Sequence, residues 1–160
     1  MGPAVITFPN DLEVVITRRF DAPIGLVFDV LAKPEHVRRW GATPPDEMTE
    51  CSIDLRVGGT YRSPFVAGDG TVFSFHRSYL EVEPPTRTVQ TWHFNCWPDV
   101  EAVETMQLQE TDAVTTLTWS MVFPDQAGRD RMTEFDGQQG SLDEMEDILQ
   151  ITSRPERCLR

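Results

Sequence analysis

The stretch from Asp125 to Ile151 has the periodicity of one long amphipathic helix, and it constrains the fold more than any other part of the chain. Its apolar residues are spaced by three, seven, three and four positions, which places them on one stripe of a helix; they are Met132, Phe135, Leu142, Met145 and Leu149. Such a stripe is stable only when it is buried against an apolar partner. The sequence therefore predicts that the other elements are arranged around a C-terminal helix.

Six or seven segments with strand character lie between Leu12 and Phe123, and they can supply that partner. They are rich in β-branched and aromatic residues and end at glycine or proline turns; they comprise residues 12–20, 48–55, 60–66, 71–82, 88–96, 100–109 and 114–123. Gly58 and Gly59 predict a tight hairpin, because glycine tolerates positive φ. We expect one curved antiparallel sheet.

Two short helices are predicted between the first strand and the rest of the sheet. Asp21 is expected to cap the first helix, and four apolar residues from Ile24 to Leu31 recur at helical spacing. Pro34 ends that helix and begins a second one, which extends to Trp40. The predicted fold is α+β and of the helix-grip type, with a sheet of six to seven strands wrapped around the long C-terminal helix. We expect one domain over residues 11–151, with 1–10 and 152–160 as flexible termini.

Charge and cysteine content limit the partners and the compartment. The formal charge of the 160 residues is −12, which opposes binding to nucleic acid and to anionic membranes. No apolar run approaches the ~20 residues of a membrane span, and the first residues do not resemble a secretory signal. Cys51, Cys96 and Cys158 are far apart and suggest no disulfide framework or zinc site. These features favour a cytoplasmic protein.

A set of aromatic and methionine residues alternates within the strands or lies on the helix stripe, and these side chains could line a ligand cavity or fill a solid core. The set is Trp40, Phe65, Phe73, Phe75, Trp92, Phe94, Met106, Trp119, Met121, Met132, Phe135 and Met145. Gln138 interrupts the helix stripe, which indicates either a pocket or a kink.

The titratable residues provide no recognisable catalytic or metal-binding motif. His76 and His93 each alternate with aromatic residues, so both are predicted on the outer face of the sheet. Glu104 shares its predicted face with apolar residues. It is either a pocket carboxylate paired with Arg77 or Arg62, or a residue near the open end of the sheet, the second being favoured by the cost of burying charge.

Several segments together resemble one known family. Residues 16–23, with the sequence ITRRFDAP, then 34–40, the glycine-pair hairpin within 54–62, and residues 79–87 are similar, in this order, to the signatures of the activator of heat-shock-protein-90 ATPase homologue-like family. The resemblance runs from about residue 16 to residue 149. It implies membership of the START-like (SRPBCC, pollen-allergen-like) superfamily and its helix-grip fold. The chain departs from the family pattern at Arg77, where a glycine is usual, and at Gln138, where a tryptophan is usual.

Three hypotheses about function follow from the residues and the resemblance. The first is binding of a small, largely apolar molecule between the sheet and the last helix, with no catalytic apparatus, metal or cofactor. The second is a chaperone co-factor or protein-interaction module acting in a stress response, as the family name implies. The third is a cyclase- or hydrolase-type enzyme in which His76, Arg77 or Glu104 transfers a proton. A homodimer formed through an exposed sheet edge is compatible with all three.

Overall fold

A nine-stranded antiparallel sheet dominates the fold, seen in a computed structural model that describes residues 4–42, 44–133 and 149. The spatial order is β1-β2-β9-β8-β7-β6-β5-β3, and β4 also pairs with β5. The strands are β1 (Val5–Thr7), β2 (Glu13–Phe20), β3 (Glu47–Met48), β4 (Ser52–Ile53), β5 (Thr60–Val66), β6 (Val72–Glu83), β7 (Arg87–Phe94), β8 (Ala102–Thr111) and β9 (Val114–Val122). The predicted α+β architecture with a curved antiparallel sheet is confirmed.

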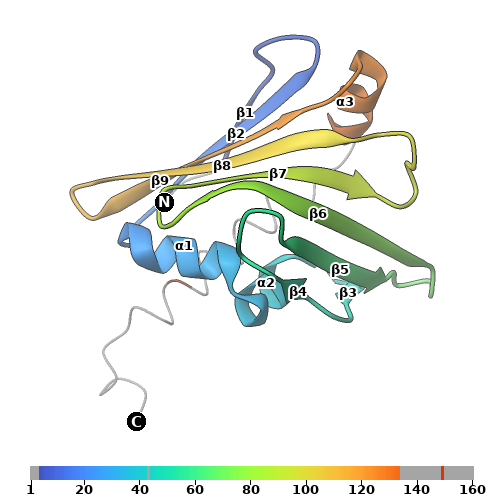
Figure 1. Cartoon of the computed structure of the whole chain (residues 1–160), viewed down its shortest axis with the longest axis horizontal. Coiled ribbons are helices and arrows are strands. Elements are labelled where there is room, and N and C mark those ends of the chain that lie inside the picture. The colour runs from blue at the N-terminus through green and yellow to red at the C-terminus, as the bar shows by residue number, and fades with distance from the viewer. Residues whose placement is uncertain (1–3, 43, 134–148, 150–160) are drawn as a thin grey trace.

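Two helices pack beneath the sheet and a third follows its last strand. They are α1 (Ile24–Ala32), α2 (Pro34–Trp40) and α3 (Gln126–Thr133). Figure 1 shows the sheet curving over α1 and α2, while α3 lies at the opposite end of the molecule. The indole Nε1 of Trp40 donates a hydrogen bond to the carbonyl of Val30 over 2.8 Å, and this bond joins α2 to α1.

The inner face of the sheet is built by the period-two alternation of its strands. In β9, for example, Thr115, Leu117, Trp119 and Met121 are buried, whereas the residues between them are more exposed. The inner residues of β2 and β8 alternate in the same way, so three adjacent strands present one largely apolar surface, in which Arg18, Glu104 and Thr115 are the polar members. This surface and the apolar faces of α1 and α2 form the core.

The strand count exceeds the six to seven predicted, for two reasons. The N-terminal lead-in contains β1, which pairs with β2 through Ile6 and Ile16. The single strand predicted over residues 48–55 is instead the two short strands β3 and β4. Pro64 explains this break, because its carbonyl accepts a hydrogen bond from Thr49 but it has no N–H to donate in return.

The structure describes only part of the segment predicted to form the C-terminal helix. α3 begins within one residue of the predicted start, and Leu149 is helical and 3% exposed. The remainder of the predicted helix, residues 134–148 and 150–151, lies outside the described residues. Its expected length is therefore not established by the structure.

The start of α1 differs from the prediction in how it is capped. Pro23, not Asp21, occupies the N-cap position, and it provides no side-chain hydrogen bond. The first backbone N–H of the helix, on Ile24, instead donates to Glu110 Oε1 over 2.6 Å. Because Glu110 lies on β8, 86 residues away, local sequence could not reveal this cap.

The glycine pair lies in a tight turn, in which Gly59 N–H donates to the carbonyl of Arg56, but the connection from β4 to β5 spans residues 54–59 and is longer than the two-residue hairpin predicted. The turn also fixes the position of β6. Gly58 has φ +83°, and a side chain on Gly59 would collide with the carbonyl oxygen of Asp54. Gly58 N–H donates to the carbonyl of Tyr79, and Tyr79 N–H donates to the carbonyl of Gly59, each over 2.9 Å. These two bonds attach the turn to β6 where its pairing register with β7 shifts, between Tyr79 and Glu81.

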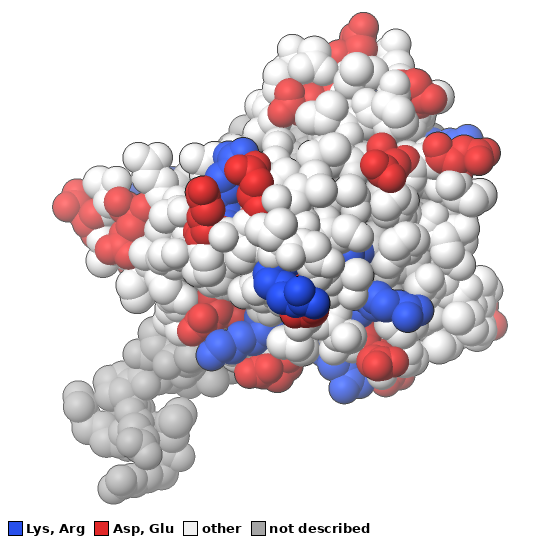
Figure 2. All heavy atoms as spheres, in the orientation of Figure 1, with Lys and Arg blue, Asp and Glu red and all other residues white. Residues whose placement is uncertain are grey.

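Charged side chains are mixed over the surface. On the face shown in Figure 2, basic groups lie beside acidic groups in both the upper and the lower half. This face has no broad basic area of the kind that binds nucleic acid. No helix in the described part of the chain is long and apolar enough to cross a membrane.

Candidate functional site

A cavity of about 150 Å³ lies between the inner face of the sheet and helices α1 and α2. Eight of the residues predicted to line a ligand site contribute to its wall: Trp40, Phe65, Phe75, Arg77, Trp92, Glu104, Met106 and Trp119. They come from α2 and from five strands, β5 to β9. The alternation pattern in the sequence therefore selected side chains that the fold brings to one place.

Other predicted residues lie elsewhere. Phe73 and Phe94 are in the aromatic cluster beside the cavity, and Met121 is buried in the core beneath β9; the wall does not include them. They share the inner face but lie further along their strands, where neighbouring side chains fill the space. Met132 is in α3, but its side chain is outside the described set, as are Phe135, Gln138 and Met145.

Stacked aromatic rings form one side of the cavity. Phe65 stacks on Phe73 at a centroid distance of 5.0 Å, and Phe75 stacks on Phe94 at 4.7 Å. The two stacks meet edge to face, with 5.5 Å between the rings of Phe65 and Phe75. Offset and edge-to-face pairs of this kind favour fixed ring positions. This side of the cavity is consequently apolar and preorganised.

A buried ion pair forms the polar side. Glu104 is 0% exposed, and its Oε1 accepts hydrogen bonds from Arg77 Nε over 2.7 Å and from Gln90 Nε2 over 2.9 Å. Its Oε2 accepts from the indole Nε1 of Trp119 over 2.8 Å. Both carboxylate oxygens thus have donors. Of the two sequence-based interpretations of Glu104, the pocket carboxylate paired with Arg77 is correct, and the one favoured by the cost of burial is wrong.

The alternation of β6 and β7 explains why these side chains meet. Phe75, Arg77 and Tyr79 lie two residues apart on β6, so all three point toward the cavity. On β7 the same rule places Gln90 on the face of Trp92, and Gln90 lies directly opposite Glu104 in the pairing of β7 with β8. Arg77 and Glu104 therefore face the interior because of strand alternation and register.

Arg77 also contacts an aromatic ring. Its guanidinium carbon lies 4.7 Å from the centroid of Tyr61, a favourable cation–π distance. Burial lowers the pKa of Arg77, but the Glu104 carboxylate together with Tyr61 and Tyr79 more than offsets this effect, so the pKa is raised. Burial also raises the pKa values of the Tyr61 and Tyr79 hydroxyls, against the opposing effect of Arg77. Arg77 is charged and both tyrosines are neutral throughout the physiological range.

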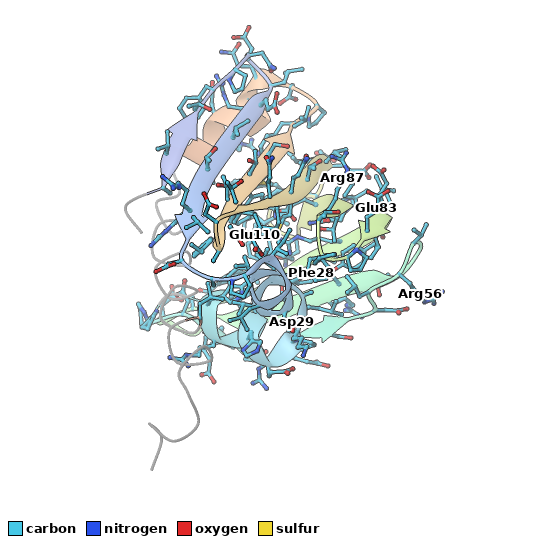
Figure 3. All side chains as sticks on the ribbon, turned by 90° about the vertical axis from the view of Figure 1, so that its left-hand side faces the viewer. Phe28, Asp29, Arg56, Glu83, Arg87 and Glu110 are labelled. Carbon is cyan, nitrogen blue, oxygen red and sulfur yellow. The ribbon has the colours of Figure 1, made fainter. Side chains whose placement is uncertain are left out.

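Two of the residues that line the cavity are labelled in Figure 3, where Arg87 at the start of β7 appears above Phe28 of α1. Arg87 Nη1 donates to Gln107 over 3.2 Å, and Arg87 lies 3.5 Å from the carboxylate of Glu81. The Arg87 side chain is 34% exposed, so this member of the cavity wall reaches solvent. Phe28 lies between its helix and the sheet, so it closes the cavity from the helix side.

The two strand histidines are away from the cavity, as alternation indicated. His76 and His93 stack face to face at 4.5 Å on the outer surface of the sheet, and His93 Nε2 lies 2.9 Å from Glu101. His76 therefore cannot serve as the proton carrier in the enzyme hypothesis. Within the described ranges, no group of three or more His, Cys, Asp or Glu side chains is placed to hold a metal ion.

Sequence reasoning missed part of the wall. The missed residues are Phe28, Leu31, Ala32, Gly41, Met48, Leu55, Tyr61, Ser63, Tyr79, Arg87, Thr88, Gln90 and Leu108. For Gln90 a signal was available, since it alternates with Trp92 and Phe94. A polar residue that alternates with inner-face aromatic residues is therefore predicted to line the cavity as they do.

The arrangement is suited to holding a molecule more than to transforming one. Glu104 already accepts three hydrogen bonds, so it has little capacity left to take a proton from a substrate. Arg77 is paired with it. The site is a small apolar cavity with a polar end in which the charges of Arg77 and Glu104 cancel.

Comparison with known proteins gives one family. The family described as "Activator of Hsp90 ATPase homolog 1-like protein" matches residues 21–150. An uncharacterized protein of Schizosaccharomyces pombe is 27% identical over 121 residues, which are 75% of this chain; the chain spans about a third (32%) of that relative's length.

Solved structures agree on the fold. A protein from Rhodobacter sphaeroides has a TM-score of 0.85 and 18% identity, with 92% of this chain and 99% of that one covered. A protein from Nitrosomonas europaea has a TM-score of 0.80 and 23% identity, with coverages of 92% and 99%. At these identities the likeness concerns the fold.

Proposed function

The chain belongs to the activator of Hsp90 ATPase homolog 1-like family, within the START-like superfamily, and from that premise we propose that it binds a small, largely apolar molecule in the cavity beneath its sheet. Residues 11–151 act as the binding domain. The observation that carries the proposal is the cavity itself, with stacked phenylalanines on one side and the Arg77–Glu104 pair on the other.

The size of the cavity limits the ligand. Its volume of about 150 Å³ is close to that of an apolar protein cavity known to hold benzene, and it is below the ~300–1,000 Å³ typical of sites for drug-sized molecules. A ligand that fits beneath the sheet has about one ring, or a short branched chain. Its apolar part contacts Phe75, Trp92 and Met106.

Native mass spectrometry tests this proposal. The freshly purified protein, and the same protein after incubation with one-ring aromatic probes, are compared with the denatured sample. We expect additional mass under native conditions that disappears on denaturation. The native peaks also report whether the protein is a homodimer. A bare mass at millimolar probe concentration would contradict the proposal.

A pair of matched variants links the signal to the cavity. Ser63 is buried and lines the cavity wall, so S63M adds a side chain that occupies the space. Ser120 alternates with the buried Trp119 and Met121 on β9, so S120M makes the same change on the outer face. S63M should abolish probe binding and S120M should retain it. Equal binding by the two variants would place the ligand elsewhere.

Activation of a chaperone ATPase is a second proposal, supported by the family match alone. It is tested by measuring the ATPase rate of an Hsp90-type chaperone with and without the protein. An unchanged rate at saturating protein would remove this proposal. S63M should not alter an activation that works through the surface of the protein.

A further inference from the structure

Gln90 has a hydrogen-bond acceptor that is not used within the described part of the protein. The residue is 4% exposed and lines the cavity. The amide nitrogen donates to Glu104 Oε1 over 2.9 Å, but the amide oxygen is buried and has no hydrogen-bond partner among the described residues. A buried polar atom without a hydrogen bond lowers stability, and most such atoms in proteins have a partner.

The orientation of the Gln90 amide is imposed by its neighbour. Glu104 is an ionised partner of Arg77, so both its oxygens only accept hydrogen bonds. Turning the amide over would set the Gln90 oxygen against Glu104 Oε1, two acceptors at 2.9 Å. The nitrogen must therefore face Glu104, and the oxygen is left for a donor from elsewhere.

The charge of the site restricts that donor. Arg77 and Glu104 neutralise each other at 2.7 Å, and their side chains are 13% and 0% exposed. An occupant with a net charge would have no free counter-charge in this polar end, and an unpaired buried ion is strongly disfavoured. A neutral O–H or N–H group meets the need of Gln90 without this cost.

The geometry points to a neutral, one-ring ligand that donates a hydrogen bond to Gln90 Oε1, as a phenol, aniline or simple amide would. This inference rests on the proposed function and narrows its ligand class. The ring lies in the apolar part of the cavity, and the donor group points to the polar end between β6 and β8. Apolarity alone would favour toluene over phenol, so tighter binding of phenol would indicate a hydrogen bond from its hydroxyl group.

The test compares three probes on the wild-type protein by isothermal titration calorimetry. Phenol and toluene have the same number of heavy atoms and differ in the donor, and benzoate carries a charge and no donor. We expect phenol to bind roughly tenfold more tightly than toluene, the effect of one buried hydrogen bond, and benzoate to bind most weakly. Equal affinities for phenol and toluene would overturn the inference and leave the proposed function standing. No binding of either would remove both.

Matched variants test whether Gln90 is the acceptor of the ligand's hydrogen bond. Q90M removes the acceptor at similar side-chain length, and Q109M makes the same change at an exposed position of β8. Q90M should lose the phenol preference and Q109M should keep it. A preference that survives in Q90M would show that the donor meets another group. If Q90M fails to fold, competition between phenol and its methyl ether, anisole, on the wild-type protein replaces it, with phenol expected to bind more tightly.

Discussion

Removing either member of the Arg77–Glu104 pair should destabilise the protein far more than removing both. In E104Q the Arg77 charge is buried without a counter-ion, and the new amide N–H₂ competes with the donors that now reach Glu104. In R77M the carboxylate keeps two neutral donors but no cation. Breaking one side of a buried pair costs about 3–5 kcal/mol, a large part of the ~5–15 kcal/mol by which domains are stable.

The double variant R77M/E104Q should lose only about 2 kcal/mol. Methionine fills much of the space of the arginine stem, and the glutamine oxygen can still accept the Trp119 indole hydrogen. The single losses sum to about 6–10 kcal/mol and exceed the double loss, so we expect a coupling free energy of about 4–8 kcal/mol. Urea unfolding followed by tryptophan fluorescence measures all four proteins, since 3 kcal/mol shifts the midpoint by about 1–3 M.

An exposed pair of nearly the same geometry provides the control. Arg56 Nε lies 2.8 Å from Asp54 Oδ2, against 2.7 Å for the buried pair, but the side chains are 71% and 50% exposed. The cycle made with R56M and D54N should give a coupling below about 1 kcal/mol, because water screens the pair. If the two cycles gave equal couplings within about 0.5 kcal/mol, the reasoning from burial would be refuted.

Three further outcomes follow from the described contacts. Burial raises the pKa of Cys51 from 9.0 to about 11, so its alkylation by iodoacetamide at pH 8 should be about 100-fold slower than that of a free thiol, as peptide mapping would show. Shielding from water lowers the pKa of His76 below 6.5, so at acidic pH the unfolded chain binds a proton at this imidazole more readily than the folded protein does. Tm should therefore fall as the pH drops through 6.5, and H76Q should flatten that part of the Tm–pH profile. In urea unfolding, G58A should lose about 1 kcal/mol from its positive φ, and G59A about 2–3 kcal/mol from the collision with Asp54.

The inner face of the sheet could be predicted because strand alternation is a local property. Phe75, Trp92 and Trp119 each lie two residues from another apolar or aromatic residue of the same strand, and that spacing identifies a face without knowledge of the neighbouring strands. Pro34 likewise marks the boundary between the two helices, because proline ends one and begins the next.

Pairings between distant segments could not be predicted in the same way. Arg77 and Glu104 are 27 residues apart, and their contact depends on strand order, register and the bulge after Tyr79. The general cost of burying a charge favoured the wrong position for Glu104, because that cost does not include the ion pair with Arg77. The capping of α1 by Glu110 was missed for the same reason.

The Glu104 cluster also affects how this protein can change during evolution. Its four side chains come from four neighbouring strands, since Arg77 lies on β6, Gln90 on β7, Glu104 on β8 and Trp119 on β9. Replacing Arg77 or Glu104 alone passes through a protein that has lost much of its stability, whereas a paired replacement does not. Substitutions at the two positions should therefore be fixed together along a lineage, and a homologue that has lost the arginine should also have lost the glutamate.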